Sequence, residues 1–263
     1  MYEILDSLPR QAVVLDLGAG PGSFDHSEYR FLTVRADLER ADLPRDGRSV
    51  VLDAVSLPFA GNTFDAVILS HVLEHVAEPK RALQEIGRVL KPSGAAYVAV
   101  PDGRLFSDRL YRKVFRDRGG HISLFDSAKR LQEMIAWYLG LPHVQTRELI
   151  SSFAYLNRKN FHSAVKRRQL RVPPLPEWAV LAISSGTALF DRLAGTSLSY
   201  YGWAMYFGHI PTPISSDPEP NVCIRCGKGL DPGDKPAKAF YRCSHCKALN
   251  ACRTLAKRDI PVL

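Results

Sequence analysis

Apolar runs of five to seven residues recur through the first hundred residues and predict β-strands. The runs are 13–17, 31–36, 49–53, 64–70 and 95–100. Most of them are continuously apolar in the middle, which is typical of parallel strands that are covered on both faces. Because helix or turn signals separate the runs, the pattern predicts an α/β fold with right-handed crossovers.

Helical periodicity predicts two longer helices between and after these strands. Apolar residues recur at helical spacing over 79–90 and again over 127–139, where Gly140 marks the helix end. Two further apolar runs, 144–153 and 198–210, predict a sixth and a seventh strand. The expected fold is therefore a Rossmann-like, doubly wound, mostly parallel seven-stranded sheet.

The first predicted strand runs into a glycine-rich loop. Asp16 stands near the end of the strand, and Gly18, Gly20 and Gly22 follow at alternate positions. Glycine accepts positive φ angles and lets a ligand approach the backbone closely. Since open α/β sheets bind ligands at the carboxyl ends of their strands, the loop predicts a nucleotide-type site, although it does not by itself distinguish one nucleotide from another.

Charge divides the chain into two unlike parts. Residues 1–100 hold 10 Lys and Arg against 14 Asp and Glu, whereas the rest of the chain holds 25 against 13. The basic part is compatible with an anionic partner, such as nucleic acid or an acidic membrane surface, and equally with a solvated basic surface. No secretory signal is evident at Met1–Asp6, and the apolar stretch 178–190 is too short to span a bilayer, so a cytoplasmic location is expected.

Two Cys-x-x-Cys pairs near the end of the chain predict a zinc ribbon. Cys223 and Cys226 are separated from Cys243 and Cys246 by 16 residues, which is typical of a closed four-cysteine zinc site. Such a site folds a segment that is too small for a core of its own. Cys252 is left over and is expected to be a free thiol.

The same patterns suggest domain boundaries. We expect a main domain over 1–212, with an insertion at about 157–197 that contains the basic patch Lys166-Arg167-Arg168 and an apolar helix from Trp178. A linker over 213–220, the zinc ribbon over 221–252 and a tail over 253–263 follow. The apolar helix suits either packing on the sheet or an interfacial lid for an amphipathic acceptor.

Five motifs together resemble the class I S-adenosylmethionine-dependent methyltransferases of the type 11 kind. The resemblance covers about residues 10–210 and is most specific in the first hundred. The motifs are Val14–Gly22, Asp53 with Leu57-Pro58-Phe59, Phe64–Val67, Val72–His75, and Arg88–Gly94. The connection after Gly22 is shorter than is usual in that family, so the cofactor is expected to be less enclosed.

The resemblance implies an S-adenosylmethionine site at the strand ends. The glycine loop would pass under the methionyl part, with Asp16 facing the ammonium group. Asp37 would bind the ribose hydroxyls, and Asp53 the adenine amino group. The full set of implied cofactor contacts is Asp16, Gly18, Ala19, Gly20, Gly22, Asp37, Leu38, Asp53, Ala54, Ser70 and His71.

Methyl transfer chiefly needs alignment, and a base is required only where the acceptor must lose a proton. His71 and His121 are the candidate catalytic residues, with Asp102 and Tyr111 as weaker candidates. His75 is interpreted as a structural residue that caps its loop.

Three functions fit the sequence. The leading one is methylation of an O or N atom of a small, lipid-linked or glycan-linked acceptor. The second is an RNA- or protein-directed methyltransferase that uses the ribbon for recognition, with Arg225, Lys228, Lys235, Lys238, Arg242 and Lys247 as candidate phosphate contacts. The third is a cofactor-binding scaffold without catalysis, which Asp16, Asp37 and Asp53 disfavour. The patterns leave the oligomeric state open.

Overall fold

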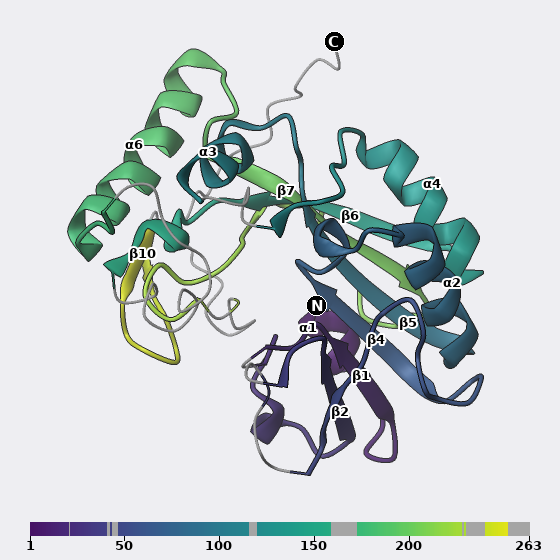
Figure 1. The fold of residues 1–263 in the computed structure, drawn as a ribbon. Coiled ribbons are helices and arrows are strands. Elements are labelled where there is room, and N and C mark those ends of the chain that lie inside the picture. Colours follow the sequence, from purple (N-terminus) through teal and green to yellow (C-terminus); the bar gives the residue numbers. More distant parts are fainter. Residues whose placement is uncertain are drawn as a thin grey trace.

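A computed structural model of the chain describes residues 1–20, 22–40, 43, 47–115, 120–158, 173–227, 229 and 240–251. Its helices and strands follow each other in mixed α/β order (Figure 1). They are α1 Tyr2–Leu5, β1 Val13–Leu17, η1 His26–Glu28, β2 Leu32–Asp37, β3 Ser49–Val51, β4 Phe64–Ser70, η3 Leu73–His75, α2 Pro79–Val89, β5 Leu90–Pro101, α3 Phe106–Val114, α4 Ala128–Leu139, β6 His143–Ile150, η5 Ala154–Leu156, α6 Glu177–Ala194, β7 Tyr200–Gly208, β8 Glu219–Pro220, β9 Phe240–Arg242 and β10 Leu249–Ala251.

Eight strands form the main sheet, in the order β3-β2-β1-β4-β5-β7-β6-β8. The first five strands of the chain are parallel, and β7 lies antiparallel between β5 and β6. The predicted Rossmann-like, mostly parallel sheet is confirmed. The predicted number of strands was wrong by one, because the two-residue strand β8 pairs with the end of β6.

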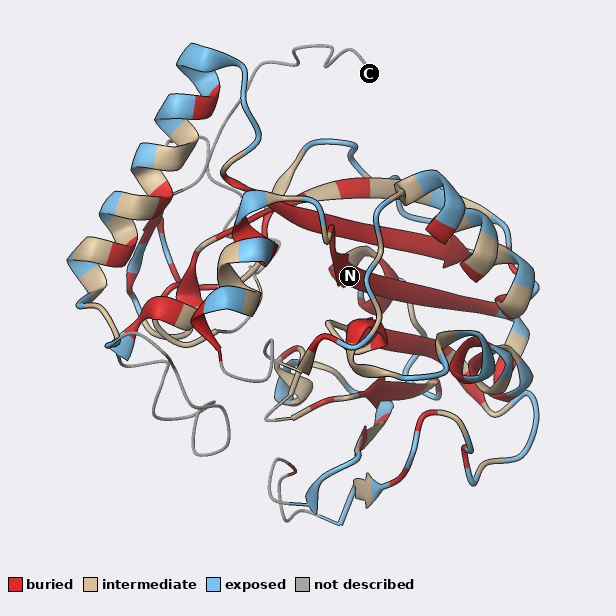
Figure 2. Cartoon of the chain, turned by 45° about the horizontal axis from the view of Figure 1, so that its top comes forward, coloured by how far each residue is buried: buried red, intermediate tan, exposed pale blue. Residues whose placement is uncertain are grey.

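Helices cover the sheet unequally. Helices α2 and α4 pack on one face over a large core that includes Leu83, Ile86 and Ile135 (Figure 1). The other face is covered by α1 and by the segment around Phe24 and Phe31. Burial follows this arrangement, since the central strands are buried while the outer faces of the helices are exposed (Figure 2). The short η1 after the glycine loop agrees with the expected truncation of the first helix.

Two predicted boundaries moved for identifiable reasons. Strand β5 begins at Leu90 and not at Ala95, because Leu90 pairs with Phe64 before the register shifts, so that 91–94 form a bulge and not a turn between elements. The segment 213–220, expected to be a linker, supplies β8 at the sheet edge. The basic patch at 166–168 and Cys252 lie outside the described residues.

The apolar helix α6 does not pack on the main sheet. It lies beside α3 and β10, away from α2 and α4 (Figure 1). Its Val180 joins a separate core with Val114, Phe153 and Ile224. Along the opposite side of α6, the exposed large apolar residues are Trp178, Leu189, Phe190 and Leu193. No helix in the described ranges is long and apolar enough to cross a membrane.

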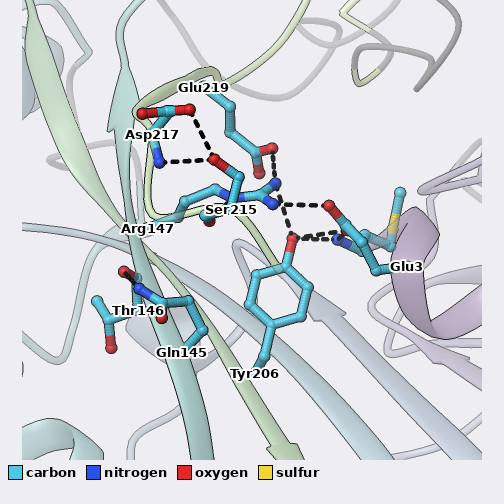
Figure 3. Close-up of polar contacts among 9 residues, drawn as sticks. Glu3, Gln145, Thr146, Arg147, Tyr206, Ser215, Asp217 and Glu219 are labelled. Atoms are coloured by element: carbon cyan, nitrogen blue, oxygen red, sulfur yellow. Dashed lines mark hydrogen bonds and ion pairs between the residues drawn. The ribbon is translucent and has the colours of Figure 1, made fainter. Parts of the chain in front are cut away.

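A buried ionic network closes the sheet edge that carries β8 (Figure 3). Arg147 of β6 contacts Glu3 at 2.7 Å and Glu219 at 2.5 Å, and it donates to the carbonyl oxygen of Ser215 at 2.7 Å. The Tyr206 hydroxyl donates to Glu3 at 3.1 Å. This network therefore joins the N-terminal segment, the middle of the sheet and the segment that precedes the cysteines.

Two helical glycines provide a matched test of packing. A Cβ at Gly87 in α2 would lie 2.4 Å from the carbonyl oxygen of Tyr138 in α4, whereas a Cβ at Gly186 in α6 would meet nothing within 4 Å. Gly186→Ala is expected to stabilise the protein by up to about 1 kcal/mol, since alanine favours helices. Gly87→Ala is expected to destabilise it by about 1–3 kcal/mol through overpacking. Urea unfolding measures both, and equal effects would contradict the close packing of α2 on α4.

Candidate functional site

A cavity of about 730 Å³ opens where the parallel strands end. Gly18 follows β1, Asp37 ends β2, Asp53 follows β3 and His71 follows β4, and all four line the cavity. This is the crevice in which open α/β sheets bind ligands, and its volume lies within the range of about 300–1,000 Å³ that is usual for ligand pockets.

The glycine loop is held tightly against the cavity wall. Gly18 has a φ of +69°, and a Cβ there would lie 2.3 Å from Cγ2 of Val72. The amides of Gly18 and Ala19 both donate to the carbonyl oxygen of Ala36, at 2.7 and 3.0 Å. A side chain at position 18 would therefore displace both Val72 and the loop. Val72, which the sequence reasoning did not place at the site, lines the cavity as well.

Two carboxylates are presented to the cavity by neighbouring turns. Asp37 accepts from the amide of Gly20 at 2.9 Å and from the amide of Glu39 at 3.2 Å, while Asp53 accepts from the amide of Val55 at 3.1 Å. A carboxylate has about four lone-pair sites, so these backbone bonds leave acceptor capacity on both side chains. Each is oriented by its own turn and can accept hydrogen bonds from a ligand.

Asp16 has a different environment. Its carboxylate is fully buried and accepts from the amide and the hydroxyl of Ser23, at 3.0 and 2.6 Å, with His26 Nε2 at 3.1 Å. These contacts tie the end of β1 to the chain beyond the glycine loop. They give Asp16 a role in shaping the loop, and its expected contact with the cofactor ammonium stays a prediction.

The residues predicted from sequence for the cofactor divide into two groups. Those that line the cavity are Gly18, Asp37, Leu38, Asp53, Ala54 and His71. Those that are not among its described lining residues are Asp16, Ala19, Gly20, Gly22 and Ser70. The second group contains loop residues whose backbone shapes the first group, as the bond between Gly20 and Asp37 illustrates.

His71 directly follows β4 and lines the cavity. Its backbone φ is +59°, which is uncommon for a residue with a side chain. Nε2 lies 2.7 Å from Oδ1 of Asn221, and Nδ1 lies 3.5 Å from Oε1 of Glu74. Burial acts to lower the pKa of His71, but the contacts with Glu74 and Asn221 outweigh it and raise that pKa. The ring is therefore positioned by a carboxylate on one side and an amide on the other.

The other end of the cavity is lined by aromatic rings and polar groups. His121 is buried, stacks on Tyr111 with ring centroids 4.7 Å apart, and places Nδ1 2.9 Å from Oδ1 of Asp108. His75 Nδ1 donates to the carbonyl oxygen of Gly120 at 2.8 Å. This contact agrees with the structural role expected of His75, but the residue also lines the cavity. Asp102 pairs with Arg104 and is not among the described lining residues.

Glu74 is a second residue of the cavity lining that the sequence reasoning did not place at the site. It is 1% exposed and lines the cavity, and neither carboxylate oxygen has a hydrogen-bond partner within the described structure. Burial acts to raise the pKa of Glu74, but the contact with His71 and the proximity of His75 and His121 lower it overall. The available signal was an acidic residue between Leu73 and Val76, which are apolar neighbours in a turn directly after a buried strand.

The four cysteines come together as predicted. One Sγ atom from each of Cys223, Cys226, Cys243 and Cys246 lies within 4.8 Å of the others, and all four are free of disulfides. The Sγ atoms of Cys223 and Cys246 are 3.6 Å apart, and those of Cys226 and Cys243 are 3.7 Å apart. Tetrahedral zinc with bonds of about 2.3 Å requires sulfur separations of about 3.8 Å. The donor set therefore fits zinc.

The cysteine segment is docked on the main domain by specific contacts. Arg225 forms a double hydrogen bond with Glu177 of α6, each at 2.7 Å. Asn157 donates to the carbonyl oxygen of Ile224 at 2.7 Å. Asn221, two residues before Cys223, reaches His71 in the cavity. The predicted ribbon is thus in contact with the candidate active site.

Part of the chain is similar to known methyltransferases. Residues 15–98 match the family described as "Methyltransferase domain". The demethylmenaquinone methyltransferase of Renibacterium salmoninarum is 57% identical over 107 residues, which are 38% of this chain and 45% of that protein. That of Corynebacterium urealyticum is 39% identical over 92 residues, 33% of this chain and 40% of that protein. The chain thus spans less than half the length of both relatives.

Solved structures extend the likeness to the fold. A SAM-dependent methyltransferase from Archaeoglobus fulgidus superposes with a TM-score of 0.52 at 18% identity, covering 79% of this chain and 89% of that one. At this identity the likeness shows the fold alone. The family match thus covers residues 15–98, and the likeness of fold to that SAM-dependent methyltransferase extends over most of the chain.

Proposed function

We propose that this protein transfers a methyl group from S-adenosylmethionine to an O or N atom of a small or lipid-linked acceptor. The observation that carries the proposal is the single cavity formed by the described residues from Gly18 to Tyr201, with two turn-held carboxylates at one end and histidines at the other. The methyltransferase match over residues 15–98 supports the reaction class.

In this proposal the carboxylates and the glycine loop orient the cofactor, which supplies an electrophilic methyl group when bound. Asp37 accepts from the ribose hydroxyls and Asp53 from the adenine amino group, while the loop at Gly18 admits the methionyl part. The protein's contribution is chiefly proximity and alignment for an in-line displacement. His71 and His121 are positioned to accept a proton from the acceptor where its chemistry requires that.

The acceptor class is inferred from two observations. The relatives aligned to residues of this chain include demethylmenaquinone methyltransferases, whose name indicates a lipid-linked quinone. The acceptor end of the cavity contains Tyr111, Tyr201 and His121, whose rings suit a flat aromatic or quinone-like group. The apolar side of α6 would suit the tail of an amphipathic acceptor at the same end of the molecule.

The RNA-directed alternative has less support. Of the basic residues proposed for phosphate contact, Arg225 is engaged by Glu177 and by the carbonyl of Cys246, and Arg242 donates to the carbonyl of Lys247. Lys228, Lys235 and Lys238 lie outside the described residues. Binding to RNA that falls steeply with salt would favour this alternative. A protein that binds the cofactor without turnover would instead favour the scaffold.

Cofactor binding is tested by calorimetry with the Asp37→Ala variant. We expect an affinity for S-adenosylmethionine that is about 10–100 times weaker, because hydrogen bonds to a charged group contribute about 1.5–3 kcal/mol. Asp126→Ala removes an exposed carboxylate paired with Arg130 and serves as the matched control, with no expected change. An unchanged affinity in Asp37→Ala would mean that the ribose lies elsewhere.

The acceptor is tested by transfer of a labelled methyl group to separated cell extract fractions. The expected result is label in the organic-solvent fraction that contains quinones and other lipid-linked compounds. Label confined to RNA or protein would contradict the proposed acceptor class while leaving the reaction class in place.

A further inference from the structure

Glu74, His75 and His121 form a cluster at the acceptor end of the cavity, and the proposed methyl transfer gives a role only to His121. Ligand atoms of Glu74, His75 and His121 all lie within 4.8 Å of one another. Its donors, one carboxylate and two imidazoles, differ from the four thiols of the cysteine cluster. We propose that Glu74, His75 and His121 bind a divalent transition-metal ion.

The second observation that supports a metal is the state of Glu74. This carboxylate is 1% exposed, aims into the cavity and has no hydrogen-bond donor among the described residues. Nδ1 of His71 lies 3.5 Å from Oε1 of Glu74. A buried carboxylate is costly unless it is paired or coordinates a metal, and a cation bound between Glu74 and the two imidazoles would compensate it.

The two imidazoles have polar outer neighbours. His75 Nδ1 donates to the carbonyl oxygen of Gly120 at 2.8 Å, and this acceptor places the proton on Nδ1, so that Nε2 carries the lone pair used for a metal. His121 Nδ1 lies 2.9 Å from the carboxylate of Asp108, although the two atoms do not have hydrogen-bond geometry. Asp108 is itself held by Arg112 at 2.7 Å. The site therefore has an orienting shell on two elements, α3 and the loop at Gly120.

The donor set selects the class of ion. Two imidazoles with one carboxylate suit transition metals such as Fe²⁺, Mn²⁺, Co²⁺ or Zn²⁺ with coordination positions left open, whereas Ca²⁺ and Mg²⁺ prefer oxygen donors alone. The open positions would face the cavity, where an acceptor oxygen can reach them. An ion at this place would lower the pKa of a hydroxyl bound to it, which is the activation that an oxygen acceptor needs.

The test is a titration of the full-length, zinc-loaded protein with Co²⁺, followed by calorimetry and by visible absorption. We expect one Co²⁺ per chain beyond the zinc, with ligand-field bands but without the intense sulfur-to-cobalt charge transfer that exchange into the cysteines would produce. Glu74→Gln and His121→Gln are expected to weaken this binding by at least about tenfold, since even the loss of an outer partner costs about 10–100-fold. Asp108→Asn is expected to weaken Co²⁺ binding by about 10–100-fold, since Asp108 is an outer neighbour of His121.

His209→Gln provides the matched control, because His209 is an exposed histidine outside the cavity lining. Its Co²⁺ affinity is expected to equal that of the unmodified protein. Zinc content and thermal midpoint verify that each variant is folded. The proposal is overturned if folded protein binds no Co²⁺ beyond the cysteines, or if Glu74→Gln and His121→Gln bind it as tightly as the parent. Since the titration uses no S-adenosylmethionine and no acceptor, its failure would leave the proposed function untouched.

Discussion

Cys223→Ser is expected to release the zinc and to unfold the cysteine segment together with its contacts on the main domain. Cys223 is 2% exposed, and its Sγ receives a bond from the buried side chain of Asn250. A hydrogen bond involving Cys226 and the neighbouring amides lower the pKa of the Cys223 thiol to about 4, whereas burial raises the pKa of the Cys243 thiol to about 11. In small zinc modules the metal contributes about 10–16 kcal/mol to folding, more than the segment's own core provides.

Cys223→Ser is expected to destabilise the main domain as well as the cysteine segment. Ile224 is 1% exposed in a core with Phe153 and Val180, and Asn221 holds His71 in the cavity. We therefore expect the main domain to lose about 2–4 kcal/mol of unfolding free energy, comparable to truncation of a buried aliphatic side chain. Methyl transfer is expected to fall as well, because His71 loses an orienting partner.

Zinc content, thermal unfolding and methyl transfer measure these three effects. Cys252→Ser is the matched control, since Cys252 is not one of the four predicted ligands, and it is expected to leave all three unchanged. Full zinc content with an unchanged thermal midpoint in Cys223→Ser would contradict a structural metal at this site. Loss of zinc without loss of activity would show that the segment does not support His71.

Arg147→Met is expected to destabilise the protein by about 3 kcal/mol, because it removes a buried guanidinium that pairs with two partly buried carboxylates. The Arg147 side chain is 3% exposed and bridges Glu3 and Glu219, which are 13% and 28% exposed (Figure 3). Arg130→Met removes an ion pair whose side chains are 74% and 61% exposed, and it is expected to change stability by less than about 1 kcal/mol. Urea unfolding compares the two, and equal effects would contradict the importance of burial.

The pH dependence of the unfolding free energy is a second test of the ionic network around Arg147. Burial acts to raise the pKa of Glu3, but the nearby amino terminus and Arg147 lower it overall, from 4.5 to about 2. A carboxylate with a lowered pKa stabilises the fold above its unfolded pKa and loses that contribution as pH falls through the folded one. Unfolding free energy is therefore expected to decrease between about pH 4.5 and 2, and Glu3→Gln is expected to remove part of that dependence.

The pattern of apolar and polar residues along the sequence was sufficient to predict much of the fold. The apolar runs predict seven strands that are present, and the helices at 79–90 and 127–139 appear close to their expected bounds. The spacing of the cysteines predicts their convergence. Asp37 and Asp53 line one cavity because parallel strands bring their carboxyl ends to one edge. These features depend on periodicity or short spacing, which a sequence carries directly.

What the sequence by itself determined is therefore the α/β fold class, the glycine loop and the four-cysteine cluster. Only the tertiary structure decided how distant segments complete the site. Asn221 reaches His71 across 150 residues of sequence. Glu74 meets His121 only because the loop at Gly120 folds over η3, where Ile122 and Ser123 donate to the Glu74 carbonyl. Such contacts depend on how packed elements dock and not on local propensity, so no pattern along the chain predicts them.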